Sequence, residues 1–163
     1  MSIIIFSRPV RSGKTTELMQ WCDRVSKTKI VGGILMPDIG GRRKLFNIET
    51  REYSDIECKD PATATRSLIT VGNFHFYTDA FEKAITIILE AASKSDLLIV
   101  DEVGKLELEC KGFYQSVKEV LEMDKYINGT EHLLLVVRDD LYEQVLSLFK
   151  ITKHRLVNKL HNI

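Results

Sequence analysis

The chain has 163 residues, of which 44% are hydrophobic and 28% are charged, as is usual for a soluble globular protein. This length fits one domain, residues 1–163, and is sufficient to bury a core without disulfide or metal support. Lys and Arg total 23 and Asp and Glu also total 23, so no overall positive charge favours binding to nucleic acid.

Cysteine usage and the apolar runs narrow the class of protein further. Cys22, Cys58 and Cys110 are odd in number and widely spaced, which argues against a disulfide framework and against a zinc site. The apolar run at the N-terminus is too short to span a membrane, and no other segment approaches the length of a span. We therefore expect a cytoplasmic protein with no membrane association.

The first third of the chain alternates apolar runs with a helical pattern. Ile3–Phe6 and Ile30–Met36 have the composition of buried strands, and residues 14–26 between them place their apolar side chains on one helical face. From about residue 40 to 77 the spacing changes to period two, as at Phe46 and Ile48, which is typical of antiparallel strands with one solvated face. We interpret this region as a small β insertion.

The same alternation resumes after the insertion. Asp79 and Glu82 form a possible capping box before a helix, and Leu97–Val100 is the clearest buried strand. Later apolar patterns predict a helix ending near residue 121, a strand over 133–137, another helix, and a last short strand starting at Ile151. Alternating strands and helices predict an α/β fold of three layers, with a mainly parallel sheet flanked by helices.

A phosphate-binding loop is predicted between the first strand and the first helix. Its backbone N–H groups and the helix N-terminus would hold phosphates. The Lys14 ammonium would contact the β- and γ-phosphates, the Thr15 hydroxyl would bind Mg2+, and Thr16 would lie on the α-phosphate side. The predicted nucleotide-binding residues are Arg11, Ser12, Gly13, Lys14, Thr15 and Thr16.

The loop departs from the usual pattern at its start. Arg8 stands five residues before Gly13, where the pattern has a glycine. Either the loop is one residue longer than usual, or Arg8 takes the glycine position. A positive φ there would create a steric conflict for a side chain as large as that of arginine.

An acidic pair at the end of the Leu97–Val100 strand completes the predicted site. Four apolar residues followed by Asp101 form a Walker B pattern, and the carboxyl end of a parallel strand is where ligand sites form in α/β folds. Asp101 would hold Mg2+ with Thr15, and Glu102 would polarise the attacking water as a general base.

Two further segments carry distinctive patterns, DEVGKLEL from Asp101 to Leu108 and GGRR at Gly40–Arg43. They resemble the DE[IV]GK[ML]E signature and the GGRR motif of the THEP1-type nucleoside-triphosphatase family, and the resemblance covers nearly the whole chain. The segments VGGILMP at 31–37 and VGNF at 71–74 resemble further family motifs. The family's glycine-rich GRPGVGKTT loop is here glycine-poor.

The resemblance implies the branch of P-loop proteins in which one strand separates the Walker A and Walker B strands and a glutamate is catalytic. It implies hydrolysis of nucleoside triphosphates, ATP and GTP alike, to the diphosphate and phosphate. It also favours Arg42 or Arg43 as the cation that stabilises the transition state, since guanidinium groups suit phosphate. Lys105 is a further candidate, and the catalytic set is Glu102, Lys14, Arg42, Arg43 and Lys105.

Two other functions remain open from the sequence. A small-molecule or nucleotide kinase would use the same loop and transfer the phosphoryl group to an acceptor in place of water. The β insertion could serve as the lid or as the acceptor pocket of such a kinase. A nucleotide-gated binding module would bind the nucleotide without turning it over.

Overall fold

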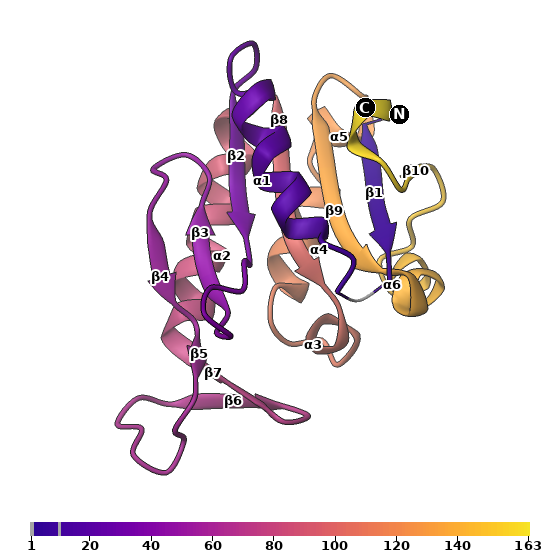
Figure 1. Ribbon diagram of the computed structural model, residues 1–163. Helices are drawn as coiled ribbons and strands as arrows, with labels where there is room; N and C mark the ends of the chain where they lie inside the picture. The colour runs from indigo at the N-terminus through magenta and orange to yellow at the C-terminus, as the bar shows by residue number, and fades with distance from the viewer. Residues whose placement is uncertain (1, 10) are drawn as a thin grey trace.

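The computed structural model describes residues 2–9 and 11–163, and a seven-stranded sheet runs through their centre (Figure 1). Its strand order is β10-β1-β9-β8-β2-β3-β4. The strands are β1 (Ile3–Arg8), β2 (Val31–Leu35), β3 (Lys44–Asn47), β4 (Tyr53–Asp55), β8 (Leu97–Val103), β9 (His132–Arg138) and β10 (Arg155–Val157). Each neighbouring pair from β10 to β2 is parallel, whereas β3 and β4 are antiparallel additions at one edge.

Helices cover both faces of the sheet, which confirms the predicted three-layer α/β fold. The longer helices are α1 (Lys14–Val25), α2 (Thr78–Lys94), α4 (Tyr114–Leu121) and α6 (Tyr142–Leu148). The short ones are α3 (Lys105–Leu108), α5 (Asp124–Ile127) and the 3-10 turns η1 (Asp139–Leu141) and η2 (Leu160–Asn162). In Figure 1, α1 lies on the near face of the sheet and α2 on the far face.

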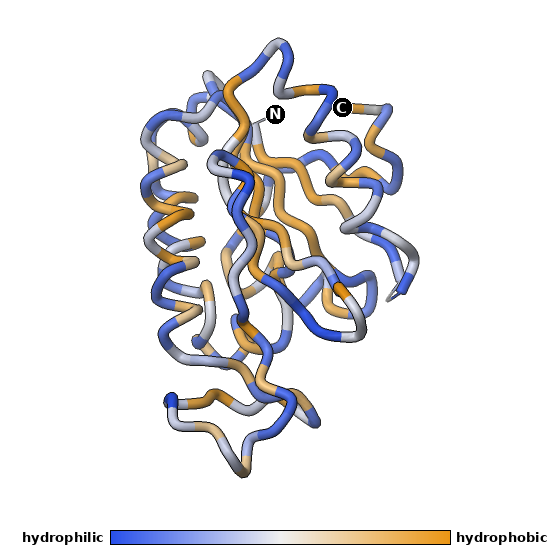
Figure 2. Tube along the Cα trace, turned by 60° about the vertical axis from the view of Figure 1, so that its left-hand side comes forward, coloured by the Kyte–Doolittle hydropathy of each residue, from blue (hydrophilic) through white to orange (hydrophobic). Residues whose placement is uncertain are grey.

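The central strands consist of unbroken runs of apolar residues, orange in Figure 2, because both faces of the sheet are covered. Successive side chains of a strand point to opposite faces. Ile4 and Phe6 therefore pack in one core with residues of α1, while Ile5 packs in the other core with residues of α2 and α4. At 2% exposure or less, these three side chains anchor β1 on both sides.

The sheet topology brings the two predicted motifs to one edge. β9 lies between β1, which precedes the phosphate loop, and β8, which carries the acidic pair. This is the order that the family resemblance implies. Because β1, β8 and β9 are parallel, their carboxyl ends meet at the lower edge of the sheet in Figure 1.

The predicted antiparallel insertion is present, and it divides into two parts. β3 and β4 extend the main sheet beside β2, whereas β5 (Glu57–Cys58), β6 (Leu68–Val71) and β7 (Phe74–Tyr77) form a separate sheet in the order β5-β7-β6. This smaller sheet projects below the strand ends in Figure 1. The expectation of one solvated face is wrong for β3, because Leu45 and Phe46 are both buried, each in a different core.

Two local predictions are also wrong. The helix α2 begins at Thr78 without a side-chain cap, and Asp79 forms an ion pair with Arg66 instead. Ile151 is buried before the last strand, which starts only at Arg155.

Among the described residues, no helix has both the length and the apolar character needed to cross a membrane.

The close approach of β2 to β8 generates a stability prediction. Gly33 has a φ of 108°, and a Cβ atom there would lie 2.1 Å from the Ile99 carbonyl oxygen. Gly33→Ala should therefore lower the free energy of unfolding by several kcal/mol, since backbone must move to relieve the clash. Urea denaturation monitored by circular dichroism measures this loss.

Gly129→Ala is the matched control for Gly33→Ala. Gly129 has a φ of 77° and no atom within 4 Å of the added Cβ position, so its substitution introduces only backbone strain, about 1–2 kcal/mol. Equal losses in the two variants would contradict the close contact between the strands.

Candidate active site

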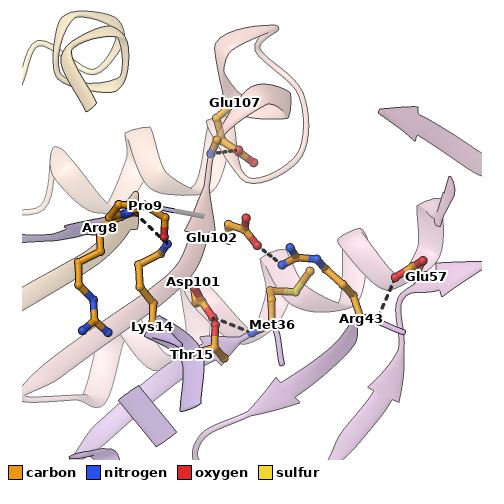
Figure 3. Close-up of polar contacts among 11 residues, drawn as sticks. Arg8, Pro9, Lys14, Thr15, Met36, Arg43, Glu57, Asp101, Glu102 and Glu107 are labelled. Carbon is orange, nitrogen blue, oxygen red and sulfur yellow. Dashed lines mark hydrogen bonds and ion pairs between the residues drawn. The ribbon is translucent and has the colours of Figure 1, made fainter. Parts of the chain in front are cut away.

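The phosphate loop leads directly into α1. Gly13 is the N-cap of the helix with a φ of 76°, and Lys14 is its first residue. The Lys14 ammonium donates hydrogen bonds to the carbonyl oxygens of Arg8, at 3.0 Å, and Pro9, at 2.7 Å (Figure 3). Burial lowers the pKa of Lys14, while the negative charges of Glu102 and Asp101 act in the opposite direction. The ammonium is thus held over the loop and near both acids.

The other predicted loop residues are open to solvent. Arg11, Ser12, Gly13 and Thr16 are all exposed, as a surface that receives a ligand requires. Val10, inside the same loop, lies outside the described residues. The Thr15 side chain is half-buried and is the only one of the predicted nucleotide-binding residues within the described loop that bonds to the acidic strand end.

Arg8 does not adopt the strained conformation that a glycine position would impose. It is the last residue of β1 and pairs in register with Arg138 on β9, so its backbone is extended. Its guanidinium forms an ion pair with Glu17 at 2.7 Å, which draws the side chain away from Lys14 (Figure 3). The positive φ falls instead on Arg11, at 57°. The steric conflict expected at Arg8 is therefore absent.

Asp101 joins the loop to the sheet. Its Oδ2 accepts a hydrogen bond from the Thr15 hydroxyl at 3.0 Å and a second from the Met36 N–H at 3.0 Å. The side chain is buried, and burial followed by the charge of Glu102 raises the pKa of Asp101 to about 6. The carboxylate is still the major form at neutral pH. Asp101 and Thr15, predicted from two distant motifs, are in direct contact.

Glu102 contacts Arg43 rather than Thr15. The two side chains form an ion pair, which Figure 3 draws as a dashed line. The Arg43 backbone N–H also donates to Glu57 at 2.8 Å, so β5 of the small sheet helps to hold this arginine in place. The structure thus brings Arg43, and not Arg42, to the acidic pair.

The remaining two candidates are Arg42 and Lys105. Arg42 is half-buried, and its charge, after the hydrogen bond and charge of Lys44, lowers the pKa of Asp55. Lys105 is exposed at the start of α3 and lines the same cavity as Glu102 and Arg43.

Glu107 is a site residue that we did not single out from the sequence. It is only 2% exposed, and its carboxylate accepts hydrogen bonds from the Gly104 N–H at 2.7 Å and the Phe113 N–H at 2.8 Å. Burial raises the pKa of Glu107 to about 7. These bonds close the turn that follows Glu102. Glu107 supplies the N3 half of a capping box to Gly104, but glycine lacks the Ser or Thr side chain that would have made the pattern recognisable in the sequence.

The residues at this edge fit a bound Mg2+ ion. Among the described residues there is no group of three or more His, Cys, Asp or Glu side chains that could form a metal cage. Thr15 and Asp101 supply two oxygen donors side by side. Mg2+ prefers oxygen ligands and takes few of them from the protein when phosphates and water supply the rest.

The fold and the paired motifs define a P-loop protein, and comparisons with known proteins agree. Residues 3–161 match the model of a family described as NTPase, so the chain belongs to this NTPase family. It is 28% identical over 145 residues to the nucleoside-triphosphatase THEP1 of Thermococcus kodakarensis, covering 85% of this chain and 81% of that protein. The corresponding protein of Korarchaeum cryptofilum is 33% identical over 140 residues, covering 82% and 69%.

A solved structure has the same fold. The crystal structure of THEP1 from Aquifex aeolicus superposes with a TM-score of 0.72, at 21% identity, and covers 99% of this chain and 92% of that one. The family resemblance, the P-loop fold and the prediction of a nucleoside-triphosphatase enzyme are confirmed.

The buried Glu107 generates a prediction on pH and stability. Its folded-state pKa of about 7 lies above the ordinary value of 4.5, so between these values the folded chain binds more protons than the unfolded chain. The stabilisation is complete below pH 4.5 and is lost as the pH rises through about 7. Glu107→Gln cannot titrate. The unfolding free energy of the wild type minus that of the variant should therefore fall by a few kcal/mol as the pH rises toward about 7, at about 1.4 kcal/mol per pH unit.

The measurement is urea denaturation of both proteins at pH 5, 6, 7 and 8. Glu109→Gln is the control, because Glu109 lies on the same segment with its side chain 60% exposed. A wild-type minus Glu107→Gln difference that does not change with pH would refute the raised pKa.

Proposed function

We propose that this protein hydrolyses nucleoside triphosphates, ATP and GTP alike, to the diphosphate and phosphate in a Mg2+-dependent reaction. The observation that carries the proposal is the hydrogen bond between Thr15 and Asp101, which joins two motifs 86 residues apart. Glu102 follows Asp101 directly and faces Arg43 across the same edge. The names of the relatives, nucleoside-triphosphatase THEP1, support this reaction class.

Each side chain has a distinct role in this mechanism. The Lys14 ammonium leaves the loop carbonyls to neutralise charge on the β- and γ-phosphates. Thr15 and Asp101 would hold Mg2+, which when bound neutralises charge on the same phosphate oxygens. Glu102 orients a water molecule and accepts its proton. Arg43 stabilises the charge on the transferring phosphoryl group, and Lys105 contributes a second positive charge at the same cavity.

We assign the nucleoside to a cavity of about 390 Å³ that lies beside Ser7 on β1 and Asn158 after β10. The Asn158 amide carries both a donor and an acceptor and can be turned to suit adenine or guanine. This supports broad base specificity.

Substitutions of Glu102 and Asp101 should affect catalysis and nucleotide binding differently. Glu102→Gln keeps the size of the side chain but removes its basicity, so it should lower kcat by about 10²–10⁴-fold while the affinity for Mg2+-ATP is retained. Asp101→Asn should weaken Mg2+ dependence and nucleotide binding together. Phosphate release and ATP affinity, measured across a Mg2+ titration, distinguish the two. Lys14→Ala is the inactive control. Wild-type turnover in Glu102→Gln would remove the general base from this mechanism.

Arg43 and Arg42 form a natural matched pair. Only Arg43 contacts Glu102, so Arg43→Ala should lower kcat by about 10²–10³-fold, approaching the effect of a full arginine finger. Arg42→Ala should change kcat by less than about threefold, as expected for a group that interacts weakly from the surface. Steady-state kinetics and ATP dissociation constants for both variants are required. Similar small effects for the two would favour a solvated basic loop.

A further inference from the structure

A second cavity, of about 350 Å³, opens beside the catalytic edge. Glu102 and Arg43 line one part of it, and Lys105 lies on α3 at another. This cavity and the nucleoside cavity are lined by different residues. In the mechanism proposed above, the γ-phosphate lies toward Glu102 and the nucleoside toward Ser7. In that arrangement the cavity beside Glu102 lies beyond the γ-phosphate.

The walls of this cavity are mainly apolar and aromatic. They include four phenylalanines that lie on β7, on α2 and just before α4, namely Phe74, Phe76, Phe81 and Phe113. Their rings form a continuous series, with centroids 6.3, 5.9 and 5.1 Å apart from one pair to the next. The first of them, Phe74, is 50% exposed, whereas the other three are buried. An exposed ring on an apolar wall is a surface on which a flat ligand can stack.

Hydrolysis alone does not require a space of this kind. A single water molecule occupies about 30 Å³ and is held by polar groups. A cavity of several hundred cubic ångströms, with apolar walls and a few converging polar groups, has the features of a small-molecule site. The charged groups nearest the acidic pair are the ion-paired Glu102 and Arg43 and the exposed Lys105, and three further polar residues also line the cavity, namely Asn73, Glu107 and Arg138.

We propose that this cavity binds a small flat aromatic or heteroaromatic alcohol and that the protein transfers the γ-phosphoryl group to its hydroxyl. This inference rests on the proposed function, because it uses the same loop and the same base. The hydroxyl proton passes to Glu102, and the hydroxyl oxygen forms a bond to the γ-phosphorus. The bond from that phosphorus to the β–γ bridging oxygen breaks, and its electron pair leaves with the nucleoside diphosphate. The products are the phosphate ester, the diphosphate and one proton.

The test measures how the phosphoryl group divides between water and an added alcohol. The full-length protein is incubated with Mg2+ and γ-labelled ATP in the presence of benzyl alcohol, 3-phenylpropanol or, as the ring-free control, ethanol at equal molarity. The two aromatic probes place the hydroxyl at different distances from the ring. Inorganic phosphate and phosphate ester are separated and counted. We expect at least one aromatic probe to give an ester-to-phosphate ratio about tenfold or more above that of ethanol, because its ring is buried in the cavity.

The aromatic wall is tested by a matched pair of variants. Phe74→Ala removes the exposed ring from the cavity and should lower the ester-to-phosphate ratio by about threefold or more. Tyr53→Ala removes an equally exposed aromatic ring, at 49%, from an edge strand that does not line the cavity, and should leave the ratio unchanged.

The outcomes separate this inference from hydrolysis itself. Phosphate release with no preference for aromatic alcohols overturns the inference and leaves the proposed hydrolase function intact. An aromatic preference that Phe74→Ala does not reduce also overturns it. Ester formation without phosphate release supports the inference and contradicts hydrolysis, whereas neither product contradicts both.

Discussion

The buried carboxylate of Asp101 is the constraint on which the rest of this site depends. A buried charge is costly unless its oxygens receive hydrogen bonds, and Asp101 receives them from Thr15 on α1 and from Met36 at the end of β2. One side chain therefore links the start of α1, the strand β8 and the end of the neighbouring strand β2. The same contact leaves the Thr15 hydroxyl and the carboxylate adjacent, as the proposed Mg2+ site requires. The fold and the proposed metal site thus have a common cause.

The turn after β8 gives Glu102 a different environment from that of its neighbour. Glu107 accepts the Gly104 and Phe113 N–H groups, so the chain reverses tightly after the acidic pair. Gly112 is required at the other side of this turn, because a Cβ atom there would lie 2.4 Å from the Glu107 carboxylate. The turn also carries Lys105 and Phe113 to the walls of the cavity beside Glu102. One buried acid therefore shapes both the position of Glu102 and the cavity beside it.

The sequence predicted the parts of this structure that depend on local patterns. The strands, α1 and the two motifs followed from apolar spacing, and topology alone then required Thr15 and Asp101 to meet. What the sequence could not provide were contacts between distant segments. Arg42 and Arg43 are equivalent in the sequence, and the contacts of Arg43 with the distant residues Glu57 and Glu102 distinguish them. Likewise Asp79 matched a capping pattern, but the distant Arg66 is its partner. The aromatic wall combines residues from three elements and has no linear signature.

The glycine-poor loop between β1 and α1 is held by side-chain contacts and by one strained residue in place of flexible glycines. Arg8 ends a strand in extended geometry, and its ion pair with Glu17 keeps the guanidinium out of the phosphate site. The left-handed residue is Arg11, three positions later, where the strain of a non-glycine residue is about 1–2 kcal/mol. Its side chain is exposed on the loop that receives the phosphates, so the same residue that strains the loop adds a positive charge there. In the proposed function that charge attracts the triphosphate, so nucleotide binding would offset the strain that the missing glycine leaves in the loop.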